Sequence, residues 1–164
     1  MLKLLTILAQ DAAELVRRSL AVTLRNSPKL PREAAVALAN DVEAVALHVL
    51  AHSPVLTDSD LIQLVRKGSA TKQTAIAKRP IVSRAVSMVI SNEGAVEAIR
   101  ALAGNNGAEL SEADMETVLV RFPNDSVTAE NLALRPVLPI NIAEKLVDAV
   151  TGKAFDYLVN HHAL

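Results

Sequence analysis

The chain has 164 residues and a formal net charge of −1 at pH 7, and 51% of its residues are hydrophobic although only 2% are aromatic. This length supports one domain with a sizeable core, and abundant Ala, Val, Leu and Ile at low net charge exclude a disordered chain. The sequence contains no Cys, which excludes a disulfide scaffold, a cysteine-ligated metal site and a cysteine nucleophile. We therefore expect a single all-α domain over 1–164.

The first helix is expected over 2–26, where the helical spacing of apolar residues begins almost at once. Residues 1–9 resemble a signal peptide only faintly, because their apolar run is short and continues directly into the helical pattern. This helix is apolar on more than one side, so we expect it to cap the first repeat, with cover for a neighbouring chain as the alternative. No run of about 18 apolar residues occurs, and we expect no membrane-spanning helix.

Further helices are predicted from apolar periodicity and from residues that begin or end helices. Thr57 with Asp60, and Ser111 with Asp114, have the pattern of an N-cap followed by an acid three residues later. The predicted ranges are 31–40, 42–52, 57–67, 70–78, 83–91, 94–103, 111–121, 126–134, 139–150 and 153–162. No alternating strand pattern competes with them.

An internal repeat runs through most of the chain. Pro28, Pro54 and Pro80 are 26 residues apart, the next step of 26 reaches a turn pair at 106–107, and a step of 30 reaches Pro136. The residue four positions before each of these anchors is apolar: Leu24, Leu50, Ile76, Leu102 and Leu132. A pair of short helices cannot bury its apolar face alone, so consecutive pairs must stack. Thin aliphatic layers of this kind explain the shortage of aromatic residues.

Several segments resemble a bacterial family of unknown function, common in alphaproteobacteria, with HEAT-like repeats akin to the leucine-rich-repeat variant. The resemblance covers about 11–150 and rests on 15–21, 31–33, 38–41, 75–80, 134–136 and above all 53–62. It implies a repeat fold and no catalytic residues. We therefore predict a right-handed α-solenoid of about five HEAT-like helix pairs with a 26-residue period. Its parts would be an N-terminal helix or cap (1–26), the repeats (27–152) and a C-terminal capping helix (153–164).

No residue pattern indicates catalysis. The sequence has no Gly-x-Ser-x-Gly elbow and no phosphate-binding glycine loop, so we expect no enzyme and no cofactor. His48 and His52 have the four-residue spacing of two metal ligands on one helix. Their positions in the other repeats hold varied, mostly polar residues, and no third ligand is close in sequence. We therefore assign these two residues to solvated surface and expect no metal site.

The charges are distributed unevenly along the chain. Residues 1–100 carry 13 Lys and Arg against 9 Asp and Glu, whereas 101–164 carry 4 against 9. No acid lies between Asp60 and Glu93. Stacked repeats turn blocks of sequence into blocks of surface, so a basic centre and an acidic far end are expected. The predicted partner-binding residues in the basic centre are Arg66, Lys67, Lys78, Arg79 and Arg84.

We expect a non-catalytic scaffold or adaptor whose extended groove, lined by the second helix of each pair, binds a protein with an acidic surface or segment. One alternative is a homodimer that pairs the basic centre of one copy with the acidic end of another. The other is a nucleic-acid-binding HEAT-like protein, against which stand the absence of Trp for base stacking and the acidic end. A role in bacterial signalling or regulation would suit an adaptor. The cytoplasm is the default location, because no cysteine reports a redox compartment.

Overall fold

The computed structural model describes residues 2–11 and 13–162, and of residues 10 and 11 the backbone alone. This part of the chain forms twelve α-helices and no β-strand, with one isolated β-bridge between Val82 and Ala108. The helices are α1 (Leu2–Asp11), α2 (Glu14–Leu24), α3 (Arg32–Ala39), α4 (Glu43–His52), α5 (Asp58–Lys67), α6 (Ala70–Ala77), α7 (Arg84–Glu93), α8 (Val96–Ala103), α9 (Glu112–Arg121), α10 (Ser126–Ala133), α11 (Ile140–Val147) and α12 (Gly152–His161). The predicted all-helical fold is confirmed.

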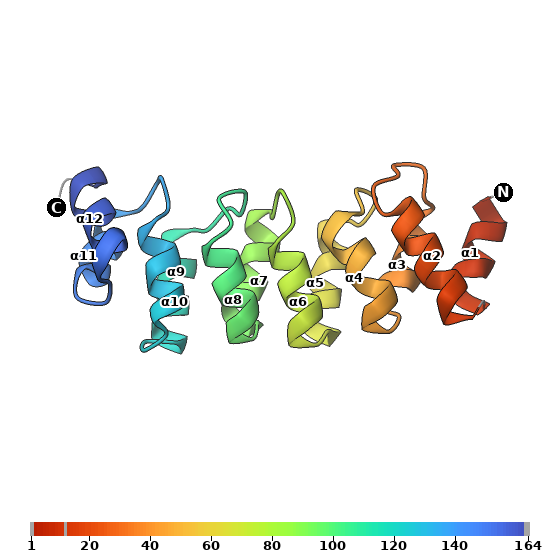
Figure 1. The fold of residues 1–164 in the computed structure, drawn as a ribbon, viewed down its shortest axis with the longest axis horizontal. Helices are drawn as coiled ribbons and strands as arrows, with labels where there is room; N and C mark the ends of the chain where they lie inside the picture. Colours follow the sequence, from red (N-terminus) through yellow and green to blue (C-terminus); the bar gives the residue numbers. More distant parts are fainter. Residues whose placement is uncertain (1, 12, 163–164) are drawn as a thin grey trace.

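The helices are arranged in an elongated row, with the two ends of the chain at opposite ends of that row (Figure 1). Most helices pack against the second helix along the chain: α2 on α4, α4 on α6, α6 on α8 and α8 on α10, and likewise α1 on α3, α5 on α7 and α7 on α9. Consecutive helices such as α3 and α4, or α7 and α8, also pack together. The even-numbered helices therefore form one layer, and the odd-numbered helices form the other.

The segment predicted as one helix, 2–26, is divided into α1 and α2. The backbone of Ala13 has φ −59° and ψ 152°, which interrupts the helical path. One helix over this segment would be about 37 Å long, whereas α3 and α4, against which it packs, have 8 and 10 residues. The break allows α1 to pack on α3 and α2 on α4, so each part is covered by a helix of similar length.

One cluster of buried aliphatic side chains runs through the row from Ala9 to Leu158. The repeat column predicted from the prolines lies in it: Leu50, Ile76, Leu102 and Leu132 are at most 1% exposed, and Leu24 packs against the cluster from its edge. Burial of a side chain of this size contributes about 1.5–3 kcal/mol. Ala residues at the neighbouring buried positions keep the helices close together, so aromatic rings find little room.

The predicted helix caps form as expected. Thr57 accepts a hydrogen bond from the Asp60 amide while the Asp60 carboxylate accepts one from the Thr57 amide, and Ser111 and Asp114 form the same reciprocal pair. Each box satisfies two main-chain donors that a helix start leaves unpaired. These caps fix where α5 and α9 begin.

Polar side chains at or just beyond the ends of the even helices connect each of these helices to the even helix before it. Each one faces main-chain carbonyl oxygens at the end of the preceding even helix, 25 to 32 residues earlier. We call this set the carbonyl ladder; it joins Arg79 to Leu50 and Ser53, Asn105 to Ala77 and Arg79, Arg135 to Ala103, Asn105 and Ala108, His161 to Pro136, and His162 to Arg135. The ladder brings the C-terminal ends of α4, α6, α8, α10 and α12 side by side, so these helices run parallel.

Candidate functional site

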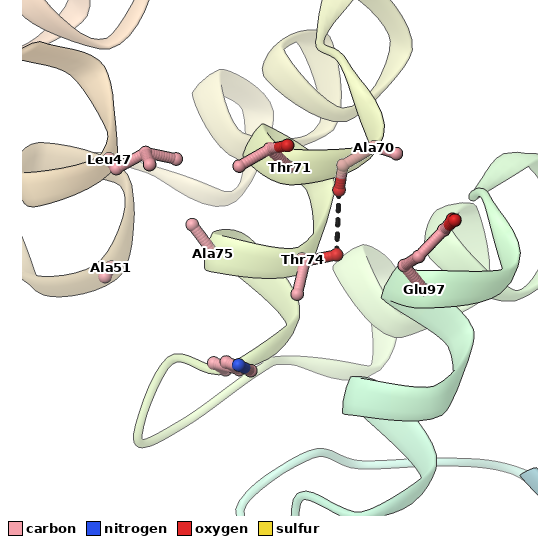
Figure 2. Close-up of a pocket in the computed structure, with 8 residues that line it drawn as sticks. Leu47, Ala51, Ala70, Thr71, Thr74, Ala75 and Glu97 are labelled. Carbon is pink, nitrogen blue, oxygen red and sulfur yellow. Dashed lines mark hydrogen bonds between the residues drawn. The ribbon is translucent and has the colours of Figure 1, made fainter. Parts of the chain in front are cut away.

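An open groove of about 470 Å³ crosses the outer face of α4, α6 and α8. Its lining residues are mostly small or aliphatic: Leu47, Ala51, Ala70, Thr71, Thr74, Ala75, Lys78 and Glu97. In Figure 2, Leu47 and Ala51 project from α4 on one side, and Glu97 stands on α8 at the other. The groove therefore lies on even helices, which precede the repeat anchors, whereas the second helices of the sequence prediction are those that follow each anchor, the odd helices.

The groove is hollow because α6 has small residues on its outward face. Its inward face carries the buried residues Gln73, Ile76 and Ala77, whereas its outward face carries Thr71, Thr74 and Ala75. The Thr74 hydroxyl donates a 2.7 Å hydrogen bond to the Ala70 carbonyl of the same helix (Figure 2). Since this hydroxyl is already bonded, the floor offers a ligand mainly apolar surface.

Two of the residues that line the groove carry opposite charges. Lys78 is the C-cap of α6, and Glu97 lies in the first turn of α8. Both side chains are exposed. Neither has a hydrogen-bond or ion-pair partner among the residues that the structure describes. Both charges are therefore available to a ligand.

The five cations predicted to bind a partner do not lie on one surface. Lys78 lines the groove, while Arg66 and Lys67 end α5 and Arg84 begins α7, both in the odd layer. The Arg66 guanidinium forms a 2.9 Å ion pair with Glu93, and both of these side chains are about half exposed. Lys67 borders a small hollow of about 100 Å³ beside Gly68.

Arg79 is directed into the protein, unlike its neighbour Lys78. Its guanidinium donates hydrogen bonds of 2.6 Å to the carbonyls of Leu50 and Ser53, and burial lowers the pKa of this group. A guanidinium remains charged at any ordinary pH despite such a shift. The structure thus gives Arg79 a role in joining α4 to the end of α6.

A group of basic side chains beside the groove was not predicted from the sequence. Arg18 and Arg25 come from α2 and its C-cap, and His48 and His52 come from α4, which packs on α2. Burial lowers the pKa of His48, and the charges of nearby basic side chains lower it further. Next to His52 in the chain, Ala51 lines the groove together with Lys78. We call Arg18, Arg25, His48, His52 and Lys78 the basic strip. The sequence signal was the helical spacing of each pair, Arg18 with Arg25 and His48 with His52, but their meeting required the packing of α2 on α4.

The described residues include neither a metal-binding cluster nor a membrane-spanning helix. They contain no group of three His, Asp or Glu side chains placed to hold a metal ion. None of the helices described is both long enough and apolar enough to cross a bilayer.

Comparison with known families finds a match, which covers the groove. Residues 45–164 match a family described as uncharacterised proteins conserved in bacteria (DUF2336). The chain belongs to this family. The DUF2336 segment begins inside α4 and includes every residue that lines the groove, whereas α1, α2 and α3 precede it. No curated protein and no solved structure matches the chain.

Proposed function

We propose that this chain is a non-catalytic protein-interaction module that binds a segment of a partner protein in the groove across α4, α6 and α8. The observation that carries the proposal is the groove itself: an open hollow with a floor of small apolar side chains and unpaired charges at its ends. An exposed apolar hollow with a few polar groups at its border is typical of binding sites. The exposed Lys78 is the one of the five predicted cations that lines this site.

We also propose that the row is a right-handed α-solenoid of HEAT-like helix pairs with a period near 26 residues. Two observations support this. The contacts between helices follow an i to i+2 order along the chain, and the carbonyl ladder repeats at separations of 25 to 32 residues. A stack of this kind holds successive even helices side by side, which is how an extended binding surface arises in repeat proteins.

The proposal is tested by filling the groove. Ala75 and Thr71 are replaced in turn by Trp, since both line the hollow and a bulky ring there would exclude a ligand. The matched control is Ala113→Trp, which places the same ring on the exposed side of α9 in the odd layer. The measurement is affinity capture from the native bacterium followed by mass spectrometry, with circular dichroism to check that each variant is folded.

The result expected is a polypeptide captured by the wild type and by Ala113→Trp, and depleted at least tenfold with both groove variants. Finding a protein bound to the wild type, without the comparison to the variants, would not support the proposal, because that protein could bind anywhere on the surface. Equal capture by all four proteins would show that the groove is not the binding site.

A further inference from the structure

Many of the cations in this chain are bound within the protein. Nine of the 17 Lys and Arg side chains contact an acid or a main-chain carbonyl of another helix or loop: Arg17, Arg32, Arg66, Lys72, Arg79, Arg100, Arg121, Arg135 and Lys145. Arg18, Arg25 and Lys78 have no such partner among the described residues. These three belong to the basic strip, so the strip carries positive charge that the described part of the chain does not neutralise.

Three residues of the basic strip lie along one edge of the even layer, while Arg18 and His48 lie within α2 and α4. Arg25 is the C-cap of α2, His52 is the last residue of α4 and Lys78 is the C-cap of α6. The acids of these helices and of α8 stand at the other edge, because Glu14, Glu43 and Glu97 lie in first turns. The small apolar residues of the groove lie between the two edges, so a ligand on this face meets positive charge along one side only.

The chemistry of the floor selects the conformation of that ligand. The side chains of the floor are aliphatic apart from two Thr, and the Thr74 hydroxyl already bonds within its helix. The backbone of α6 is hydrogen-bonded within its own helix, and the described residues contain no strand edge to extend. An extended peptide would leave its own N–H and C=O groups unpaired against this surface. A helix pairs those groups internally and can offer apolar side chains at i, i+3, i+4 and i+7.

We infer that the partner segment is an acidic amphipathic helix, which places its apolar face in the groove and its carboxylates on the basic strip. This inference rests on the proposed function and names the class of partner. Helices in a layer are about 8–10 Å apart, so a segment that crosses from α2 to α8 spans about 24–30 Å. At 1.5 Å per residue this corresponds to roughly 16–20 helical residues.

The test is an unbiased selection with a displayed library of 20-residue peptides. The wild type and Ala75→Trp are used as parallel baits, and the peptides enriched by the wild type alone are sequenced. We expect an excess of Asp and Glu along one flank of a helical apolar pattern. Enriched peptides that are neutral, basic or without helical spacing would overturn this inference and leave the groove proposal standing. No enrichment of the wild type over Ala75→Trp would overturn the groove proposal itself.

Charge reversal then assigns the acidic contacts. In Arg25→Glu/Lys78→Glu, two side chains without internal partners are reversed, so the fold should be retained. We expect the affinity for a selected acidic peptide to fall about tenfold or more, because two ion pairs are lost and each reversed charge repels the peptide. The control Lys29→Glu/Lys153→Glu makes the same change in net charge at other exposed positions and should alter the affinity less than twofold. If both double variants lost affinity equally, the loss would be due to net charge alone, and the assignment of the contacts to Arg25 and Lys78 would be overturned.

Discussion

The guanidinium of Arg79 donates a 2.6 Å hydrogen bond to the main-chain carbonyl of Ser53, 26 residues earlier in the chain. A second bond from the same group, also 2.6 Å, goes to Leu50 in the last turn of α4. Carbonyls at the end of a helix lack partners within that helix, and the negative end of the helix dipole attracts a cation. Arg79 therefore satisfies the end of one even helix from a position just beyond the end of the next.

The first prediction concerns this contact. Arg79→Met keeps an unbranched side chain but removes both charge-assisted hydrogen bonds, and it leaves two carbonyls unpaired. We expect the free energy of unfolding to fall by about 2–4 kcal/mol, measured by urea denaturation. The neighbouring variant Lys78→Met removes an exposed cation and should change the midpoint little. Identical midpoints for the two variants would contradict the role assigned to Arg79.

The second prediction concerns stability at acid pH. Arg32 forms a two-pronged ion pair with Asp60 at 2.5 and 2.8 Å, which, together with hydrogen bonds from Thr57, lowers the pKa of Asp60 to about 2. An Asp in an unfolded chain has a pKa near 3.9, so the unfolded state takes up protons first. This contribution to stability is therefore present above about pH 4 and is lost as the pH falls toward 2.

Thermal melting at a series of pH values between about 5 and 2 tests this linkage. Arg32→Gln should lower the melting temperature at neutral pH and make its fall toward pH 2 shallower than in the wild type. Part of the slope will remain, because Arg17 lowers the pKa of Asp41 and Arg100 lowers that of Asp125 in the same way. Parallel melting curves for the two proteins would show that the Arg32–Asp60 pair does not contribute.

The third prediction concerns the turn between α8 and α9. A Cβ atom on Gly107 would lie 1.9 Å from the carbonyl oxygen of Pro80, at the place where the Val82 amide donates to the Gly107 carbonyl. Gly107→Ala must therefore move backbone, and we expect a loss of about 1–3 kcal/mol. Gly104→Ala is the control, since its Cβ would meet the Asn131 side chain at 3.2 Å and the Arg100 carbonyl oxygen at an ordinary contact distance of 3.5 Å. Calorimetry should show a clear drop for the first variant and a smaller one for the second.

The fourth prediction separates the two surfaces that could hold an acidic partner. Lys67→Glu/Arg84→Glu reverses two cations of the odd layer, and Arg25→Glu/Lys78→Glu reverses two of the basic strip. With a captured partner immobilised, we expect only the second pair to weaken binding. Loss of binding in the first pair would support the surface predicted from the sequence around Arg66, Lys67 and Arg84.

The fifth prediction addresses nucleic acid. Arg66 is paired with Glu93 and Arg79 with carbonyls, which removes two cations from any phosphate-binding surface in the basic centre. A gel shift with duplex DNA should therefore show no complex at about 50 mM salt. A complex that weakens steeply by about 200 mM, as counterion release requires, would instead favour the nucleic-acid alternative.

Features that depend on local pattern were predictable from the sequence. The capping pair of Thr57 and Asp60 needs only two residue types at a fixed spacing. The buried positions of Leu50 and Ile76 follow from apolar residues that recur at the same place in each repeat. A helix start is determined by residues within one repeat, and the buried column is determined by contacts between adjacent repeats.

Features that depend on the relative rotation of packed helices were not predictable. Lys78 and Arg79 are adjacent and chemically alike, yet one borders the groove and the other reaches the carbonyls of the preceding helix end. Residue type cannot distinguish the two roles, because the directions in which adjacent side chains point at a helix end depend on how the neighbouring helices pack. Similarly, Arg25 approaches His48 through the packing of α2 on α4.

The carbonyl ladder gives the row a mechanical property. Each rung joins the end of one even helix to the end of the even helix before it. Tension applied to the two ends of the chain therefore loads the rungs in series, and the weakest rung breaks first. Arg135 makes three hydrogen bonds from a buried position. At the C-terminal end, His161 and His162 make one each, and that of His161 is exposed. Under force the protein should therefore peel from its C-terminal helix before its centre opens, and the groove across α4, α6 and α8 would outlast the end of the rod.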